Sequence, residues 1–261
     1  MATSNGAHPP IITSIWGPEK TGKSSLGMTF PPRIEVFDFD LGYDRAAYRF
    51  HREEESGLLV CHSYPAPLNI TVQRNQPLQG YKELWYRFLT DFMSALTDDA
   101  VHTLMIDTAT QCWQICHMAF LQEKQEAQLP LDARGKDAKG NTLRESLIPI
   151  EYAEPNARMR AVVQAGKGYH KNLVITHYQG AVYSKRMNGD RVEDYDTGEK
   201  QLDGFKQTAG LSDIVLRTRV EGVTPKAVVT LCGLSLNLVG IELVNPTYDS
   251  IMGALDSLRS V

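Results

Sequence analysis

The sequence has few cysteines, a polar N-terminus and no long apolar run. Its 4 cysteines form no C-x-x-C pair and have no histidine partner at zinc-finger spacing, which argues against a disulfide framework and against a zinc site. No apolar stretch approaches the roughly 18 residues that a membrane-spanning helix requires. We therefore expect no signal peptide, no membrane partner and a cytoplasmic location.

An excess of charge of one sign is also missing. Lys and Arg number 27 against 31 Asp and Glu, which gives a formal net charge of -4. The molecule as a whole therefore does not attract nucleic acid, and any such binding requires a local basic patch. With 42% apolar and 22% charged residues, the composition is that of a globular protein and excludes disorder, collagen and coiled coil.

No internal repeat or low-complexity tract divides the chain, so we predict a single domain over 11–261 that follows a flexible arm over 1–10. Short apolar runs alternate with segments of helical periodicity, which favours an α/β fold with a mainly parallel sheet and helices on both faces. The predicted strands are 11–16, 34–37, 58–61, 104–106, 173–176, 214–216, 227–231 and 236–243, and the predicted helices are about 23–30, 81–96, 112–120, 155–163 and 248–258.

Two polar segments interrupt this alternation, and both are predicted to be mobile loops. The segment 122–148 is rich in Gln, Lys and Asp and lacks periodicity. The segment 181–206 begins with polar and apolar residues that alternate about Asn188-Gly189, the strongest short-range signal of a β-hairpin. We therefore expect a hairpin inserted into the α/β domain.

A phosphate-binding pattern lies near the N-terminus. Residues 17–24 read Gly-Pro-Glu-Lys-Thr-Gly-Lys-Ser and fit G-x-x-x-x-G-K-[ST] without a mismatch, between an apolar strand and a helical pattern. This context predicts that backbone N–H groups and the positive helix end surround ATP, that Lys23 contacts the β- and γ-phosphates, and that the Ser24 hydroxyl binds Mg²⁺. The alternative is a chance match in a turn. The predicted nucleotide-binding residues are Gly17, Pro18, Glu19, Lys20, Thr21, Gly22, Lys23, Ser24 and Ser25.

Carboxylates follow two of the predicted strands. Asp107 ends the strand 104–106 and is predicted to share Mg²⁺ with Ser24, its alternative role being a helix N-cap. Hydrolysis also needs a group that orients and deprotonates water in line with the γ-phosphate. Asp38 and Asp40 close the second strand on one face, and we predict that Asp40 is the catalytic group and that Asp38 is a supporting or capping carboxylate. The alternative is a solvated acidic turn.

A histidine follows a third strand. His177 comes after 173–176, at the sheet edge where α/β proteins bind ligands. We predict a catalytic role beside Lys23 and Asp40, in which His177 senses the γ-phosphate by a hydrogen bond. The alternative is a structural histidine.

The order of these motifs resembles the RecA-like P-loop ATPase core. Its compact form resembles the phage RecA-core recombinases and single-strand annealing proteins of the Sak group, often described as AAA-domain or nucleotide-binding phage proteins. In bacterial RecA the water-activating acid follows the second strand in an apolar-Asp-x-Glu pattern, and residues 37–40 read Phe-Asp-Phe-Asp here. The resemblance implies a Mg²⁺-dependent ATPase, stimulated by DNA, whose nucleotide state controls single-stranded DNA binding in recombination or annealing. It also implies a homo-oligomer, ring or filament, located in the host cytoplasm if phage-encoded.

The resemblance also places DNA-binding loops at 122–148 and 181–206. The cations predicted to contact DNA are Arg134, Lys136, Lys139, Lys185 and Arg186, and the alternative for each is a solvated surface charge. Arg217 and Arg219 alternate onto one face of a late strand, so either is a candidate to complete a neighbouring subunit's site. Their alternative is surface ion pairing.

Two other functions use the same phosphate loop. A nucleotide or small-molecule kinase would move the phosphoryl group to a small acceptor, but the Arg-poor hairpin does not resemble a kinase lid. An accessory motor ATPase of DNA packaging or replication is the second alternative. DNA-stimulated ATP turnover separates the kinase from the others.

Overall fold

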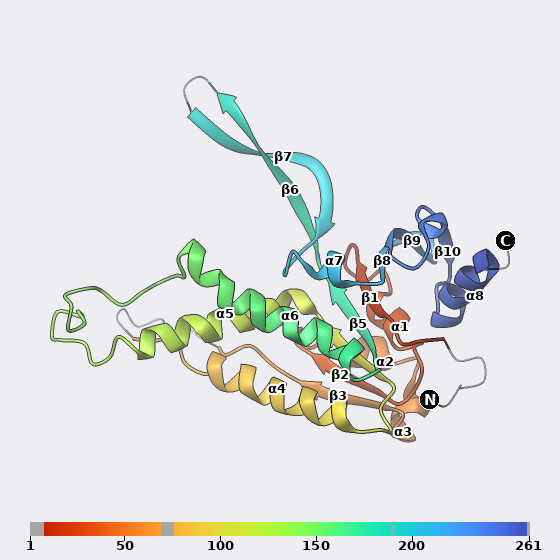
Figure 1. Cartoon of the computed structure of the whole chain (residues 1–261), viewed down its shortest axis with the longest axis horizontal. Coiled ribbons are helices and arrows are strands. Elements are labelled where there is room, and N and C mark those ends of the chain that lie inside the picture. Colours follow the sequence, from red (N-terminus) through yellow and green to blue (C-terminus); the bar gives the residue numbers. More distant parts are fainter. Residues whose placement is uncertain (1–7, 69–75, 189–190, 260–261) are drawn as a thin grey trace.

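The computed structural model describes residues 8–68, 76–188 and 191–259, which form a large sheet with a projecting two-stranded ribbon (Figure 1). The eight-stranded sheet has the order β10-β9-β8-β1-β5-β4-β2-β3. Its strands from β8 to β3 run parallel. β9 pairs antiparallel with β8, and β10 pairs antiparallel with β9. The strands are β1 (Ile12–Trp16), β2 (Ile34–Asp38), β3 (Leu59–Ser63), β4 (Thr103–Asp107), β5 (Asn172–His177), β6 (Gln179–Asn188), β7 (Arg191–Leu202), β8 (Ile214–Glu221), β9 (Thr224–Cys232) and β10 (Glu242–Val244).

Helices cover both faces of this sheet, as predicted. Alternate side chains of the buried strands enter two separate cores, one against α4, α5 and α6 and the other against α1, α2 and α8. Both faces are apolar because each lies under helices, which explains the continuous apolar runs. The helices are α1 (Lys23–Gly27), α2 (Tyr43–Ala47), α3 (His51–Glu55), α4 (Tyr81–Thr97), α5 (Ala109–Glu126), α6 (Ala153–Gly168), α7 (Thr208–Leu211) and α8 (Tyr248–Arg259), with short 3₁₀ turns at Pro149–Tyr152 and Leu236–Leu238. The predicted α/β class with a mainly parallel sheet is confirmed.

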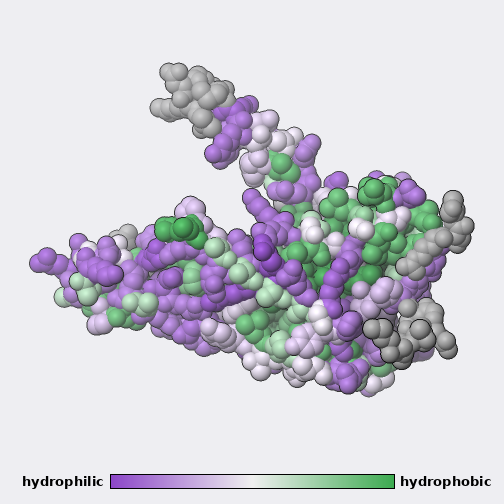
Figure 2. All heavy atoms as spheres, in the orientation of Figure 1, coloured by the Kyte–Doolittle hydropathy of each residue, from purple (hydrophilic) through white to green (hydrophobic). Residues whose placement is uncertain are grey.

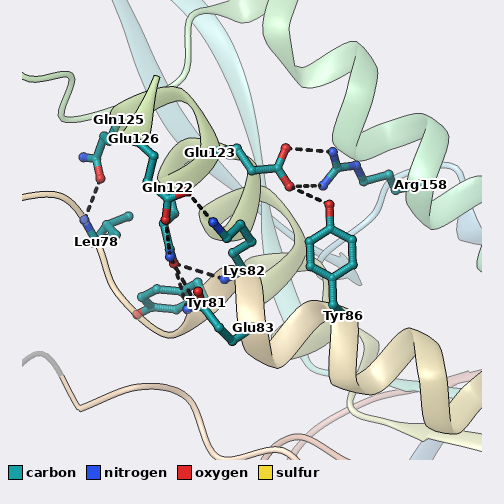
Figure 3. Close-up of polar contacts among 10 residues, drawn as sticks. All are labelled: Leu78, Tyr81, Lys82, Glu83, Tyr86, Gln122, Glu123, Gln125, Glu126 and Arg158. Atoms are coloured by element: carbon teal, nitrogen blue, oxygen red, sulfur yellow. Dashed lines mark hydrogen bonds and ion pairs between the residues drawn. The ribbon is translucent and has the colours of Figure 1, made fainter. Parts of the chain in front are cut away.

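The predicted loop 122–148 is wrong at its start, because α5 continues to Glu126. Gln122 is buried, and its carboxamide oxygen accepts the N–H groups of Tyr81 and Lys82, each at 3.0 Å (Figure 3). These are first-turn donors of α4, whose N-cap is Gly80 and supplies no side chain. Gln122 therefore caps a neighbouring helix, and this polar residue belongs to the core.

The segment 181–206 is mostly the two-stranded ribbon of β6 and β7 rather than a loop, and it projects away from the sheet (Figure 1). Its pairing runs from Gln179 with Leu202 out to Asn188 with Arg191. The hairpin insertion is thus confirmed, although Gly189 of the predicted turn lies outside the described residues. Most of the predicted arm 1–10 also lies outside them.

The predicted strand 236–243 is also wrong. A 3₁₀ turn occupies Leu236–Leu238 and only Glu242–Val244 pairs with β9. Gly240, with φ near 90°, breaks the apolar run between them. The helices α2 and α3 were not predicted, because each spans five residues and is too short to show helical periodicity.

Hydrophobic surface gathers where β8, β9 and β10 lie, whereas the end of the molecule beyond α5 is mainly hydrophilic (Figure 2). The exposed apolar side chains on the first of these surfaces include Val220, Val223, Leu231, Leu234 and Leu236. The phosphate loop lies near this end of the molecule, and the segment after α5 lies at the opposite end (Figure 1).

Candidate functional site

The phosphate loop joins β1 to α1 with the backbone that its glycines permit. Gly17 has φ near 148° and Gly22 has φ near 86°. A Cβ on Gly17 would lie 2.4 Å from the carbonyl oxygen of Thr218, so a larger residue does not fit there. Gly22 is the N-cap of α1 and no side chain caps this helix, so its first-turn N–H groups are available to a phosphate.

Lys23 is held inside this loop. Its side chain is buried, and Nζ donates to the carbonyl oxygens of Gly17 at 3.1 Å and Pro18 at 2.7 Å. Burial lowers the pKa of Lys23, while the nearby Asp107 carboxylate acts in the opposite direction. The ammonium group is thus placed at the loop that would wrap the phosphates.

A strand distant in sequence supports the loop, and no sequence motif indicated it. Thr218 of β8 is buried, and its Oγ1 lies 2.6 Å from Oγ1 of Thr21. Thr21 in turn donates to the carbonyl oxygen of Pro18 at 2.8 Å. Thr218 also meets the first glycine of the loop through its carbonyl oxygen. A lone threonine in a strand carries no signal of such a role.

Asp107 ends β4, next but one to β1 in the sheet. It is buried, its Oδ1 accepts a hydrogen bond from Thr176, and its Oδ2 has no hydrogen-bond partner among the described residues. Burial raises the pKa of Asp107 to about 6, while the nearby Thr176 and Ser24 hydroxyls act in the opposite direction.

This arrangement fits the predicted magnesium site. A buried carboxylate oxygen without a partner is costly unless a cation or donor meets it, and Asp107 lies within hydrogen-bonding reach of Ser24. In the described part of the chain, no group of three or more His, Cys, Asp or Glu could hold a metal ion. Mg²⁺ in nucleotide sites commonly has one or two protein ligands, with phosphates and water completing its shell.

The two carboxylates after β2 have different environments. Asp38 is buried, and its oxygens accept the N–H groups of Gly42 at 3.2 Å and Tyr43 at 3.0 Å, so it caps the start of α2. Burial raises the pKa of Asp38 although these N–H groups oppose the shift. Asp40 is half-buried, with Oδ1 accepting from Gly42 at 3.0 Å and Oδ2 accepting from the Tyr178 hydroxyl at 3.1 Å. Asp40 is the more accessible of the two.

His177 is fully buried at the end of β5, beside Trp16 of β1 in the parallel register. Its Nδ1 lies 3.0 Å from the carbonyl oxygen of Asp203, which only accepts, so Nδ1 carries the proton. Burial lowers the pKa of His177 to about 4, so the ring is neutral at pH 7. Nε2 is buried without a partner among the described residues and can only accept in this tautomer. A phosphate also accepts, so Nε2 suits a water or another donor better than the γ-phosphate itself.

The predicted basic residues lie in three places. Arg217 follows Leu216 on β8, with its guanidinium 5.0 Å from the ring centre of Trp16, and Arg219 forms an ion pair with Glu242. Lys185 and Arg186 are exposed on β6, where their backbone partners are Asp194 and Glu193.

The remaining three cations lie on the segment after α5, away from the phosphate loop (Figure 1). Arg134, Lys136 and Lys139 are exposed. Their backbone N–H groups are bound by two carboxylates, with Asp132 accepting from Arg134 and Lys136, and Asp137 from Lys139, each at 2.8 Å. These contacts between carboxylates and backbone N–H groups hold the turns without using the cationic side chains.

The chain is similar to one protein family and to solved structures of low sequence identity. A family model described as an AAA domain (AAA_24) matches residues 10–238. The solved structure of the RadB recombinase is similar, with 11% identity and a TM-score of 0.48 over 90% of this chain and 86% of that chain. A KaiC-like protein from the hyperthermophilic archaeon Pyrococcus horikoshii has 10% identity and a TM-score of 0.44 over 90% of this chain and 85% of that chain. No curated protein sequence matches the chain.

Within residues 8–68, 76–188 and 191–259, none of the helices has both the length and the apolar character needed to cross a bilayer.

The range matched by the family model contains the phosphate loop, Asp40, Asp107 and the whole hairpin. It spans most of the chain and ends within the 3₁₀ turn that precedes β10. The chain therefore belongs to the AAA domain family, as an ATPase-type nucleotide-binding domain whose phosphate loop is carried by a mainly parallel α/β sheet.

Proposed function

We propose that this protein hydrolyses Mg²⁺-bound ATP and that its nucleotide state controls binding of single-stranded DNA, in recombination or annealing of the phage RecA-core (Sak group) kind. The observation that carries the ATPase part is Oδ2 of buried Asp107, which has no hydrogen-bond partner among the described residues and lies close to Ser24 and to the buried Lys23. This combination of a phosphate-binding loop, one cation and one free carboxylate oxygen suits a nucleotide with its metal.

In this proposal, Ser24 and Asp107 hold Mg²⁺, which supplies charge neutralisation on the phosphate oxygens when bound. Lys23 exchanges its contacts with the Gly17 and Pro18 carbonyls for contacts with the β- and γ-phosphates. Asp40 orients the attacking water and takes its proton. His177 accepts a hydrogen bond from a water molecule through Nε2. It therefore senses the phosphate end of the nucleotide through this water.

Single-stranded DNA binding is assigned to Arg134, Lys136 and Lys139, with Lys185 and Arg186 of the hairpin as further contacts. All five side chains are exposed, and the two carboxylates nearest the first three cations, Asp132 and Asp137, accept backbone N–H groups. Phosphate contacts of this kind make DNA affinity fall as salt rises. Each cation contributes about 0.7 to 1 to the slope of log affinity against log salt concentration.

The decisive experiment compares the parent with the Arg134→Ala/Lys136→Ala/Lys139→Ala variant. It measures ATP turnover with and without single-stranded DNA, and DNA affinity over a range of salt concentrations. We expect DNA to stimulate the parent, and the triple variant to bind DNA more weakly, with its salt slope reduced by about two to three. ATP affinity should stay unchanged, because the segment lies away from the phosphate loop.

The control for this experiment is Arg49→Ala/Arg52→Ala, which removes exposed cations near α3 and should keep the parent's salt slope. An unchanged slope in the triple variant would remove these three residues from the DNA interface. A parent that turns over ATP but ignores DNA would favour the kinase alternative. Stimulation by double-stranded DNA alone would favour the motor ATPase.

The proposal includes a homo-oligomer, ring or filament, in which Arg217 or Arg219 acts on a neighbour's nucleotide. Arg217 is the better candidate, since Arg219 already has Glu242 as an ion-pair partner. If the site is completed between subunits, turnover per subunit should fall as the protein is diluted at saturating ATP. A constant value over a wide dilution range would restrict the site to one chain.

A further inference from the structure

A hydrogen bond spans the carboxyl edge of the sheet at the candidate site. The Tyr178 hydroxyl donates to Oδ2 of Asp40 at 3.1 Å. Tyr178 directly follows β5 and Asp40 follows β2, and β4 with Asp107 at its end lies between these strands in the sheet. The phenol therefore bridges across the strand that carries the predicted metal ligand.

The hydrogen bond from Tyr178 fixes Oδ2 of Asp40, and the other carboxylate oxygen, Oδ1, has a donor of its own. Oδ1 of Asp40 accepts the Gly42 N–H at 3.0 Å. With one donor on each oxygen, the carboxylate cannot rotate about its Cβ–Cγ bond without losing a hydrogen bond. A base that activates water needs such a fixed orientation, because proton abstraction depends on the direction of its lone pairs.

Tyr178 is itself held in place by its backbone. Its N–H donates to Oγ1 of Thr110 at 3.1 Å and its carbonyl oxygen accepts the N–H of Asp203 at 2.9 Å. Thr110 completes this arrangement by donating to the carbonyl oxygen of Asp203 at 2.9 Å. These contacts lie where β6 begins and β7 ends, so Tyr178 stands at the foot of the hairpin.

The phenol remains a donor at neutral pH. Burial, followed by the charge of Asp40 and the hydrogen bond to it, raises the pKa of Tyr178 to about 12. The proton on its oxygen is therefore available to the carboxylate throughout the physiological range.

We propose that Tyr178 is a positioning residue, which orients the Asp40 carboxylate for water activation. The inference rests on the proposed ATPase function, and Tyr178 acts through Asp40 without touching the nucleotide. Losing the phenol oxygen should lower kcat, while the nucleotide affinity supplied by the phosphate loop stays the same.

The test combines Tyr178→Phe, Asp40→Asn and the double variant, with Tyr183→Phe as the matched control on the exposed surface of β6. We expect Tyr178→Phe to lower kcat about tenfold, with Kd for ATP and the unfolding temperature close to the parent's. Tyr183→Phe should match the parent. In the Asp40→Asn background, Tyr178→Phe should have no further effect on kcat, because its target is already gone.

Equal losses of kcat in both backgrounds, an unchanged kcat in the parent background, or a loss of ATP affinity would each overturn the assignment. A second measurement does not depend on turnover. The ¹³Cζ resonance of labelled Tyr178 should move on Asp40→Asn and stay in place on Asp44→Asn, an exposed acid of α2. If the parent does not hydrolyse ATP, the proposed function fails, and an unmoved resonance would refute the contact between Tyr178 and Asp40 as well.

Discussion

Lys23→Ala is expected to weaken ATP binding by roughly 100-fold, because it removes a cation that would make charge-assisted hydrogen bonds worth about 3 kcal/mol with the phosphates. Nζ of Lys23 is enclosed by the loop, with Gly17 and Pro18 carbonyls as its present partners. The ammonium is thus already oriented toward the interior of the loop, so little reorganisation is needed to reach a bound phosphate. Isothermal titration calorimetry with ATP and Mg²⁺ measures the effect.

Two further variants make this prediction specific. Lys23→Met keeps a buried apolar stem of similar length and should lose affinity as much as Lys23→Ala does. Arg49→Ala removes an exposed cation elsewhere and should bind ATP like the parent. A Kd within about twofold of the parent's for both Lys23 variants would contradict the assignment of the phosphate loop.

Asp40→Asn should have a different signature, retaining ATP and Mg²⁺ while turnover falls by about 10²-fold or more. The substitution preserves the size of the side chain but removes the ability to accept a proton from water. Asp38 is a poor substitute, because it is buried at the start of α2 with backbone N–H groups on both oxygens, whereas Asp40 is only half-buried. Single-turnover hydrolysis at saturating ATP measures the chemical step directly.

The control for this variant is Asp44→Asn, which removes an exposed negative charge four residues further along the chain. It should turn over ATP like the parent. Near-parent turnover in Asp40→Asn would show that another group activates the water. His177 would then be the next candidate, because the lone pair of its Nε2 meets no donor among the described residues.

Features encoded locally could be predicted from the sequence. The phosphate loop has a fixed spacing of glycines and a lysine, and the strand before it is apolar throughout, so both follow from neighbouring residues. The hairpin was visible in the same way from its alternation and its turn residues. Asp107 and Asp40 were predicted because each follows an apolar strand, and His177 because ligands bind at the carboxyl edge of such a sheet.

Features that depend on distant contacts were not visible. Gln122 is a polar residue in a polar stretch, so its sequence context suggests a loop. Its burial is explained by the first-turn N–H groups of α4 that its side chain accepts. The tautomer of His177 is set by a carbonyl oxygen that lies 26 residues away. Thr218 supports the phosphate loop through a single hydroxyl, and a single hydroxyl in a strand forms no pattern. Such roles require the spatial neighbours, which a single sequence does not supply.

The support of the phosphate loop by β8 has a consequence for biosynthesis. β1 lies between β5 and β8 in the sheet, and Thr21 meets its partner Thr218 across 197 positions of sequence. At about 5–20 residues per second, a ribosome needs roughly 10–40 s to proceed from the first of these threonines to the second. During most of that interval β1 lacks both neighbouring strands, and after β5 has been made it still lacks β8, so the loop has its motif but not its full support. Competence to bind nucleotide should therefore arise late in translation, so that a truncated chain ending before β8 would not sequester ATP.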